Sequence, residues 1–219
     1  MKKIVIFGAG GRVGRAAVAE AVRRGHAVTA VVRDPDKYAE LGTSDVLGTS
    51  GTVTVVRGDA TDAESVAAVA AGHDAAVNAS GRLDVPAEEY FTSAARALVD
   101  GLGRAGVGRL LVLGIATTLE TSPGVRVMDD PQFPEEYRLF SQGHVAEFEL
   151  LRATATELDW LMVVPPMDLN AQAEATGSYR SAVGAVVGQG RISHADLAVA
   201  LLDEIERPQH RGVQWAVSH

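Results

Sequence analysis

The chain has 219 residues, 47% of them hydrophobic, which is enough for one domain with a sizeable core. Its formal net charge of −8 does not fit a general nucleic-acid binder, which would carry a basic surface. Because the chain contains no cysteine, disulfides, thiolate catalysis and cysteine metal sites are excluded.

The first residues bear on localisation. Lys2 and Lys3 precede an apolar run, as at the start of a signal peptide, but Gly8 breaks that run and Arg12 soon follows, so it is too short for one. No run approaches the roughly 18 apolar residues of a membrane span. We therefore expect a cytoplasmic protein without a membrane partner.

A glycine-rich turn follows the first predicted strand. Residues 4–7 form a buried apolar run, residues 15–24 have a helical pattern, and Gly8, Gly11 and Gly14 lie between them. Such a turn lets a pyrophosphate approach the helix N-terminus, where unpaired N–H groups and the helix dipole favour an anion. The spacing is GxxGxxG rather than the GxGxxG of the common dinucleotide fingerprint, because position 13, where the last glycine of that fingerprint would fall, is Val13.

Strand and helix patterns then alternate along the chain. Further apolar runs cover residues 27–32, 53–56, 75–79, 110–113 and 161–164, and helical patterns cover 62–71, 87–102 and 134–156. This alternation predicts an α/β fold, a Rossmann-like, doubly wound parallel sheet. We expect a single NAD(P)-binding domain over residues 1–219, with a core over 1–164 and a small C-terminal substrate-binding region over 165–219.

The end of the second strand bears on the choice of cofactor. An Asp or Glu there accepts hydrogen bonds from the ribose of NAD, but this chain has Arg33. A guanidinium suits a phosphate, which favours NADP(H). Asp34 follows directly and is able to take the ribose role, so NAD(H) remains the alternative.

The next two strands also end in candidate cofactor contacts. Asp59 and Ala60 follow the third strand, where they would reach the adenine, although Asp59 is also a candidate helix cap. Ala79 and Ser80 follow the fourth strand, where small residues let the cofactor pass closely. Asn78 before them fits strand-end hydrogen bonding equally well.

Three segments interrupt the alternation. Residues 42–52 read as an exposed crossover loop rich in Gly, Ser and Thr. Residues 114–134 and 165–190 follow strand ends, the edge at which open α/β sheets bind ligands, so we expect functional loops there. Pro165 and Met167 begin the second of these and would line the nicotinamide pocket, with a structural turn as the alternative.

The lysine content weighs against ordinary dehydrogenase chemistry. All three lysines lie at positions 2, 3 and 37, so the Tyr-x-x-x-Lys pair that protonates a carbonyl is absent, and Tyr137 has Ser141 at its fourth position. This favours acceptors that need no strong protein acid, such as flavins and quinones. Histidine is the side chain suited to proton transfer near neutral pH, so His144 is a candidate proton donor, or else a surface histidine of its helix.

Other histidines have simpler interpretations. His194 is expected at a helix start capped by Ser193. No two histidines are spaced for ligation from one helix face, so no metal site is predicted.

Several further motifs accompany the glycine turn. They lie at residues 32–37, 58–62, 72–75, 119–124, 130–134, 158–160 and 192–198. With these motifs nearly the whole chain resembles the atypical short-chain dehydrogenase/reductase proteins of the NmrA-like, NAD(P)H-binding type. Within that type it is most similar to the NADH-flavin reductase-like group, relatives of biliverdin reductase B.

The resemblance implies roles for individual residues. The pyrophosphate would be held by Gly8, Gly11, Arg12, Val13 and Gly14. Arg33 would meet the adenosine phosphate or ribose, and Asp59 and Ala60 the adenine. The nicotinamide side would be lined by Ser80 and by residues 114–117, among them Gly114 and Thr117. Residues 115–118 and 171–177 depart from the family pattern where substrate should lie.

These observations lead to one main hypothesis and two alternatives. The main hypothesis is an NAD(P)H-dependent oxidoreductase that transfers hydride to a planar acceptor such as a flavin, a quinone or a polycyclic aromatic metabolite. His144, Thr117 and Ser80 are its candidate catalytic residues, and the protein would be a monomer or homodimer. The alternatives are a non-catalytic NAD(P)-sensing regulator and a pathway enzyme that oxygenates or isomerises an aromatic polyketide.

Overall fold

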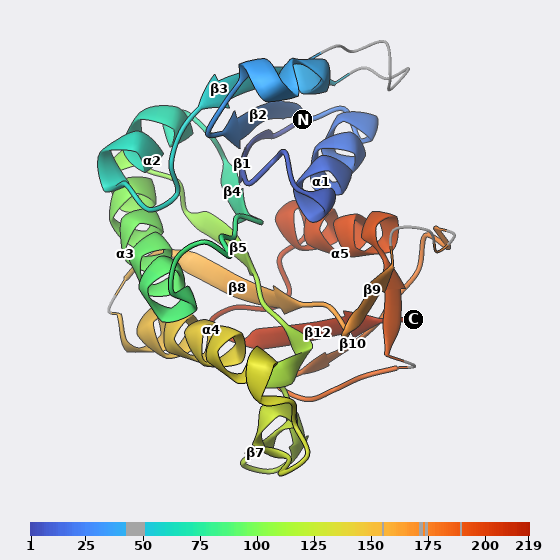
Figure 1. Cartoon of the computed structure of the whole chain (residues 1–219). Helices are drawn as coiled ribbons and strands as arrows, with labels where there is room; N and C mark the ends of the chain where they lie inside the picture. Colours follow the sequence, from blue (N-terminus) through green and yellow to red (C-terminus); the bar gives the residue numbers. More distant parts are fainter. Residues whose placement is uncertain (43–50, 155, 171–172, 174, 189) are drawn as a thin grey trace.

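An eight-stranded sheet forms the centre of the molecule (Figure 1). The computed structural model describes residues 1–42, 51–154, 156–170, 173, 175–188 and 190–219. In spatial order the strands are β3 (Thr52–Arg57), β2 (Ala27–Val32), β1 (Lys3–Phe7), β4 (Ala75–Asn78), β5 (Arg109–Leu113), β8 (Asp159–Val164), β12 (Gln214–Ser218) and β10 (Arg180–Val183).

The sheet is parallel apart from its last pair. β1 pairs with β2 on one side and β4 on the other, and only β10 runs antiparallel, against β12. The strand order reverses between β1 and β4, which makes this the switch point at which doubly wound folds bind ligands. The predicted Rossmann-like α/β fold is confirmed.

Helices cover both faces of the sheet (Figure 1). One face carries α1 (Arg12–Arg23) and α5 (His194–Glu206), and the other carries α2 (Ala63–Ala70), α3 (Ala87–Ala105) and α4 (Glu135–Ala153). Side chains of β1 alternate between the two cores, with Ile4 and Ile6 in the first and Val5 and Phe7 in the second. Because both faces of β1 are buried, its residues from Ile4 to Phe7 are all apolar.

The C-terminal part of the chain differs from the expectation of long loops. The segment 114–134 contains the short helices η3 (Ala116–Thr118) and η4 (Val127–Asp129) and the hairpin of β6 (Glu120–Ser122) and β7 (Val125–Arg126). The segment 165–190 contains β9 (Asp168–Asn170), which pairs with β11 (Arg191–Ser193), and also β10. Strands this short carry too little periodicity to be recognised in the sequence.

Two further differences concern helix and strand limits. α1 begins at Arg12, three residues before the predicted start, because the glycine turn leads directly into the helix. β12 was not expected, and with β10 it adds residues beyond 164 to the central sheet. Most of the predicted crossover loop, residues 43–50, lies outside the described residues.

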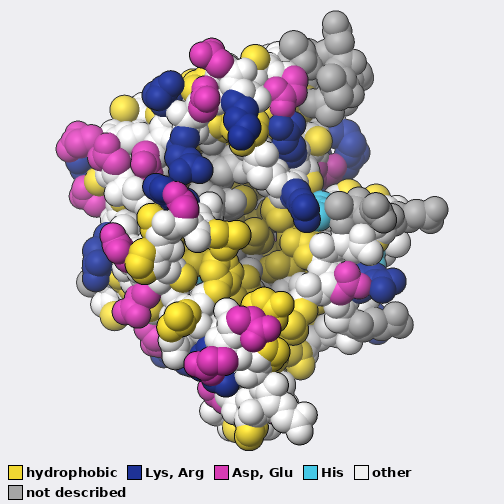
Figure 2. Space-filling view, in the orientation of Figure 1, with side chains coloured by type: hydrophobic (Ala, Val, Ile, Leu, Met, Phe, Trp, Pro, Cys, Tyr) yellow, Lys and Arg dark blue, Asp and Glu magenta, His cyan; other side chains and the backbone are white. Residues whose placement is uncertain are grey.

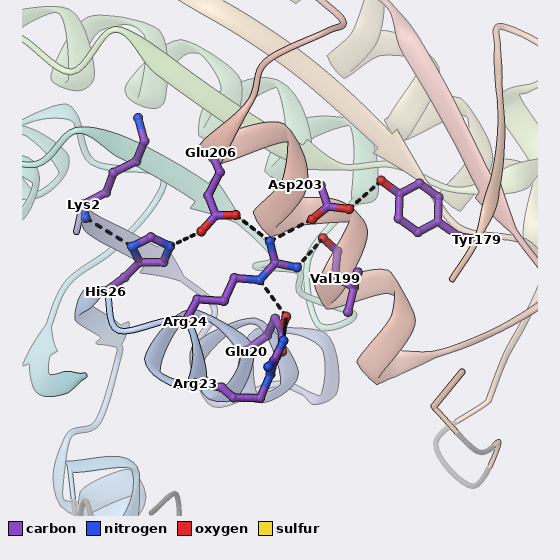
Figure 3. A network of polar contacts seen from close by, with 9 residues as sticks. All are labelled: Lys2, Glu20, Arg23, Arg24, His26, Tyr179, Val199, Asp203 and Glu206. Atoms are coloured by element: carbon purple, nitrogen blue, oxygen red, sulfur yellow. Dashed lines mark hydrogen bonds and ion pairs between the residues drawn. The ribbon is translucent and has the colours of Figure 1, made fainter. Parts of the chain in front are cut away.

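A polar network joins α1 to α5 (Figure 3). The Arg24 guanidinium, at the C-terminal end of α1, donates to Glu20, Asp203 and Glu206 at distances of 2.7–2.8 Å. The Tyr179 hydroxyl, on the chain leading into β10, donates to the same Asp203 (2.9 Å). The network therefore ties the C-terminal segment to the first helix of the fold.

Candidate cofactor and substrate site

The glycine turn packs against the end of β4. Gly8 has a φ of 74°, and a Cβ there would lie 2.5 Å from the backbone nitrogen of Ser80. A Cβ at Gly14 would lie 2.1 Å from the carbonyl oxygen of Gly8. No side chain fits at either position. This close contact holds the turn against the end of β4, at the switch point between β1 and β4.

The N-terminus of α1 is open to an anion. Its N-cap residue, Gly11, makes no side-chain hydrogen bond to the helix, so the first-turn N–H groups have no cap. Gly10 lies against the Tyr38 ring, so closely that a Cβ on Gly10 would come within 2.5 Å of a ring atom. These groups fit the pyrophosphate of a dinucleotide.

A groove of about 480 Å³ runs along the ends of β1 to β4. This volume falls within the roughly 300–1,000 Å³ typical of small-molecule sites. Among the predicted residues, those that line it are Gly8, Gly11, Arg33, Asp59, Ala60, Ala79 and Ser80. The structure thus brings together residues from four separate strand ends.

Other predicted cofactor residues lie outside this lining. Gly14 and Val13 are buried beneath the turn. Arg12 is exposed at the start of α1. The pKa of His194 lies below its ordinary value, first because its imidazole is partly buried and second because of the charge on Arg12. Gly114 and Pro165 follow β5 and β8 and are both buried.

Charged side chains of both signs line the groove. Arg33 and Lys37 follow β2, and Arg82, which the sequence analysis did not select, follows β4. Arg82 Nε donates to Asp84 (2.9 Å). Asp34 and Asp59 are the acidic residues of the lining. The groove therefore offers guanidinium groups for a phosphate and carboxylates for ribose or adenine.

Tyr90 on α3 is a second lining residue that the sequence reasoning missed. Its hydroxyl donates to Ser80 Oγ (2.8 Å), and the Ser80 hydroxyl donates to Asn78 Oδ1 (2.5 Å). Burial raises the pKa of Tyr90, so the phenol stays protonated. Tyr90 lies in the amphipathic pattern of a predicted helix, and only the packing of α3 distinguishes it from a core residue.

A smaller, apolar pocket of about 210 Å³ lies at the ends of β5, β8 and β12. Its lining includes Ala116 after β5, Val164 and Pro166 at β8, and Val217 on β12. Figure 2 shows apolar side chains surrounding a hollow on this face of the molecule. Since β5 and β8 succeed β4 in the sheet, the pocket continues the edge along which the larger groove, the candidate cofactor groove, runs.

Two loops form the outer wall of this apolar pocket. Leu119 and Val127, at the ends of the hairpin, line it together with Val186 from the segment after β10. Backbone hydrogen bonds join the loops, from Glu120 N to Gly184 O (3.0 Å) and from Val186 N to Glu120 O (3.2 Å). The two segments that depart from the strand–helix alternation thus build one wall.

The candidate catalytic residues are separated. Ser80 lines the cofactor groove, whereas Thr117 and His144 line neither hollow. Thr117 is buried, and its hydroxyl lies 2.9 Å from Ser141 Oγ, whose own proton goes to the Tyr137 carbonyl. The Thr117 hydroxyl is therefore engaged with Ser141 rather than with either hollow.

His144 is buried and is not a surface histidine, because α4 turns this face toward α3. Its ring lies 3.8 Å from the Phe91 ring, centroid to centroid, and Nδ1 lies 3.1 Å from Glu147 Oε2. Burial raises the pKa of Glu147, and among the described residues its Oε1 has no hydrogen-bond partner. Ser193 caps α5 as predicted, with its hydroxyl accepting from Asp196 N.

Residues 8–208 match the model of the NAD(P)H-binding family. The chain belongs to this family. An uncharacterised Bacillus subtilis protein, YwnB, is 34% identical to it over 98% of this chain and 97% of its own length.

Solved structures agree on the fold. A Streptococcus pneumoniae protein provisionally named an NADH-flavin reductase has a TM-score of 0.82 at 28% identity, with 100% of both chains covered. A Bacteroides thetaiotaomicron protein provisionally named an epimerase has a TM-score of 0.85 at 31% identity, covering 100% of this chain and 97% of its own. Together, the family match and the reductase neighbour support an oxidoreductase with a nicotinamide cofactor.

None of the helices in the described part of the chain combines the length and hydropathy that crossing a bilayer requires.

Proposed function

We propose that this protein is an NADP(H)-dependent oxidoreductase that reduces a planar, apolar acceptor. The observation that carries the proposal is the succession of two hollows along one sheet edge. The charged groove fits a dinucleotide, and the apolar pocket next along the edge fits an acceptor without charge.

The groove offers residues for each part of a nicotinamide dinucleotide that lies along it. The uncapped N-terminus of α1 would hold the pyrophosphate, and Asp59 and Ala60 would meet the adenine. Arg33 and Lys37 would hold a 2′-phosphate, which is the reason for preferring NADP(H) over NAD(H). When bound, the cofactor supplies a hydride.

The hydrogen bonds at the site favour water as the source of the proton. Ser80 donates its proton to Asn78, and Thr117 lies beside Ser141, so neither hydroxyl is free to donate elsewhere. His144 is enclosed by Phe91 and Phe140 and pairs with Glu147. An acceptor that takes hydride and is then protonated by solvent, such as a quinone or flavin, suits this arrangement.

The test is cofactor oxidation in the presence of an acceptor panel. NADPH consumption should be seen with a quinone or flavin. Thr117→Val should leave kcat within about twofold, because the Thr117 hydroxyl is engaged with Ser141 and lines neither hollow. A simple ketone should not be reduced. Binding of NADPH without turnover of any acceptor would contradict the proposal and support the sensing alternative.

A further inference from the structure

The apolar pocket differs in chemistry from the cofactor groove beside it. The described residues that line it are aliphatic residues, proline, methionine or glycine, and none of them is charged. Met167 and Val186 at its edge keep 68% and 48% of their surface exposed, so the opening is apolar too. Only a ligand without charge enters such a site without losing hydration that nothing replaces.

The size of the pocket restricts its occupant further. Its volume of about 210 Å³ lies below the roughly 300–1,000 Å³ of typical ligand sites. Backbone hydrogen bonds of Glu120 and Val186 join the two loops of its outer wall to each other. One or two fused rings are therefore a better match than three or four.

The charge around the pocket points the same way. The segment that forms one wall carries the exposed carboxylates Glu120, Asp129 and Asp130, and Figure 2 shows acidic side chains beside the apolar hollow. The whole chain has a formal net charge of −8. A phosphate-bearing acceptor would meet repulsion at this opening.

Building on the reductase function proposed above, we propose that this pocket selects uncharged quinones of one or two rings and discriminates against flavin nucleotides. The quinone gains a hydride from the reduced cofactor and a proton from water, which yields the hydroquinone and the oxidised cofactor. Size excludes the three-ring flavin system, and charge adds a penalty for its phosphate.

Three acceptors separate size from charge. 1,4-Naphthoquinone is small and neutral, riboflavin is larger and neutral, and flavin mononucleotide is larger and anionic. We expect kcat/KM with NADPH to fall in that order, by about tenfold or more from naphthoquinone to flavin mononucleotide. Equal or higher kcat/KM for flavin mononucleotide would overturn the inference while leaving the reductase function intact.

A variant at the opening tests the location of the site. Val186→Trp should narrow the pocket and weaken naphthoquinone binding to the NADP⁺-bound protein by about tenfold, measured by ligand-observed NMR. Val183→Trp is the matched control, because Val183 is 54% exposed and lies outside the pocket. NADP⁺ affinity should be unchanged in both variants.

The binding measurement keeps the two proposals distinguishable. Suppose that no acceptor is reduced, but naphthoquinone still binds and Val186→Trp weakens that binding. The reductase function then fails and the pocket assignment stands. Unaltered naphthoquinone binding in Val186→Trp would overturn the pocket assignment, whatever the turnover.

Discussion

Gly8 combines a backbone constraint with a steric one. Its φ of 74° is a left-handed conformation, and a Cβ would also meet the backbone of Ala79 and Ser80 at 2.5–2.6 Å. The second constraint is the close approach of two strand ends at the cofactor groove. A substitution here should therefore damage both stability and cofactor binding.

Gly8→Ala should destabilise the fold more than Gly72→Ala does. Gly72 has the same φ of 74° but nothing within 4 Å of its Cβ position, so its variant carries only the backbone cost, roughly 1–2 kcal/mol. The contact at Gly8 should add about 1–3 kcal/mol. Urea unfolding of both variants measures the difference, and equal losses would contradict the steric argument.

Glu147 is a buried carboxyl whose pKa is raised by burial. Between its unfolded and its raised folded pKa, the native state binds more protons than the unfolded state, so this residue makes the protein less stable as pH rises through that window. Its Oε1 accepts no hydrogen bond from the part of the chain that the structure describes, which adds to the cost of the charged form.

Glu147→Gln should remove this dependence. Relative to the wild type, the variant should gain stability as pH rises from about 4.5 through the raised pKa, measured as Tm across a pH series. Glu149→Gln on the same helix is the control, because the Glu149 side chain is 48% exposed. A Tm difference that does not change with pH would count against the argument.

At the scale of elements, a cation at the end of α1 neutralises carboxylates at the end of α5. Asp203 and Glu206 lie at the C-terminal end of α5, where the helix dipole disfavours negative charge. Arg24 donates to both and to Glu20 (Figure 3). Burial acts to raise the pKa of Glu20, but hydrogen bonds from Arg23 and Arg24 outweigh it, and the pKa is lowered.

Arg24→Ala should cost about 3 kcal/mol of stability, because it removes a largely buried guanidinium that bonds to three carboxylates at once. Arg23→Ala is the matched control. Arg23 bonds to the same Glu20, but its side chain is 63% exposed against 13% for Arg24, so its removal should cost less than about 1 kcal/mol. Chemical denaturation of both variants provides the measurement, and similar losses would refute this role of Arg24.

At the scale of the whole molecule, the cofactor groove connects strand ends that are far apart in the sequence. Gly8, Arg33, Asp59 and Ser80 each follow a different strand of the sheet. A ligand that contacts all four stabilises only the folded chain, so its affinity is measurable as stability.

NADP⁺ at 100 times its Kd should add about 2.7 kcal/mol to the free energy of unfolding. At the same concentration NAD⁺ should give a smaller rise in Tm, because it lacks the phosphate that Arg33 would bind. In Arg33→Ala the difference between the two cofactors should become smaller, with Lys37 left as the remaining cation for the phosphate. Equal rises in the wild type would argue against the preference for NADP(H).

Much of the molecule follows from the sequence by itself. The alternation of apolar runs with helical patterns determined the parallel sheet and its flanking helices, since each signal is local and repeats over many residues. The glycine spacing and the strand-end residues Arg33, Asp59 and Ser80 indicated a shared groove, the one that we propose for the cofactor, because parallel strands of one sheet end at one edge.

Only the tertiary structure decided what lies between distant segments. The joining of β6–β7 to the residues after β10 by backbone hydrogen bonds, which builds the apolar pocket, has no sequence signal, because such bonds do not depend on side-chain type. Tyr90 beside Ser80 and the burial of His144 depend on how α3 and α4 pack. Local patterns specify which face of a helix is apolar, but not which side chain of another element it meets.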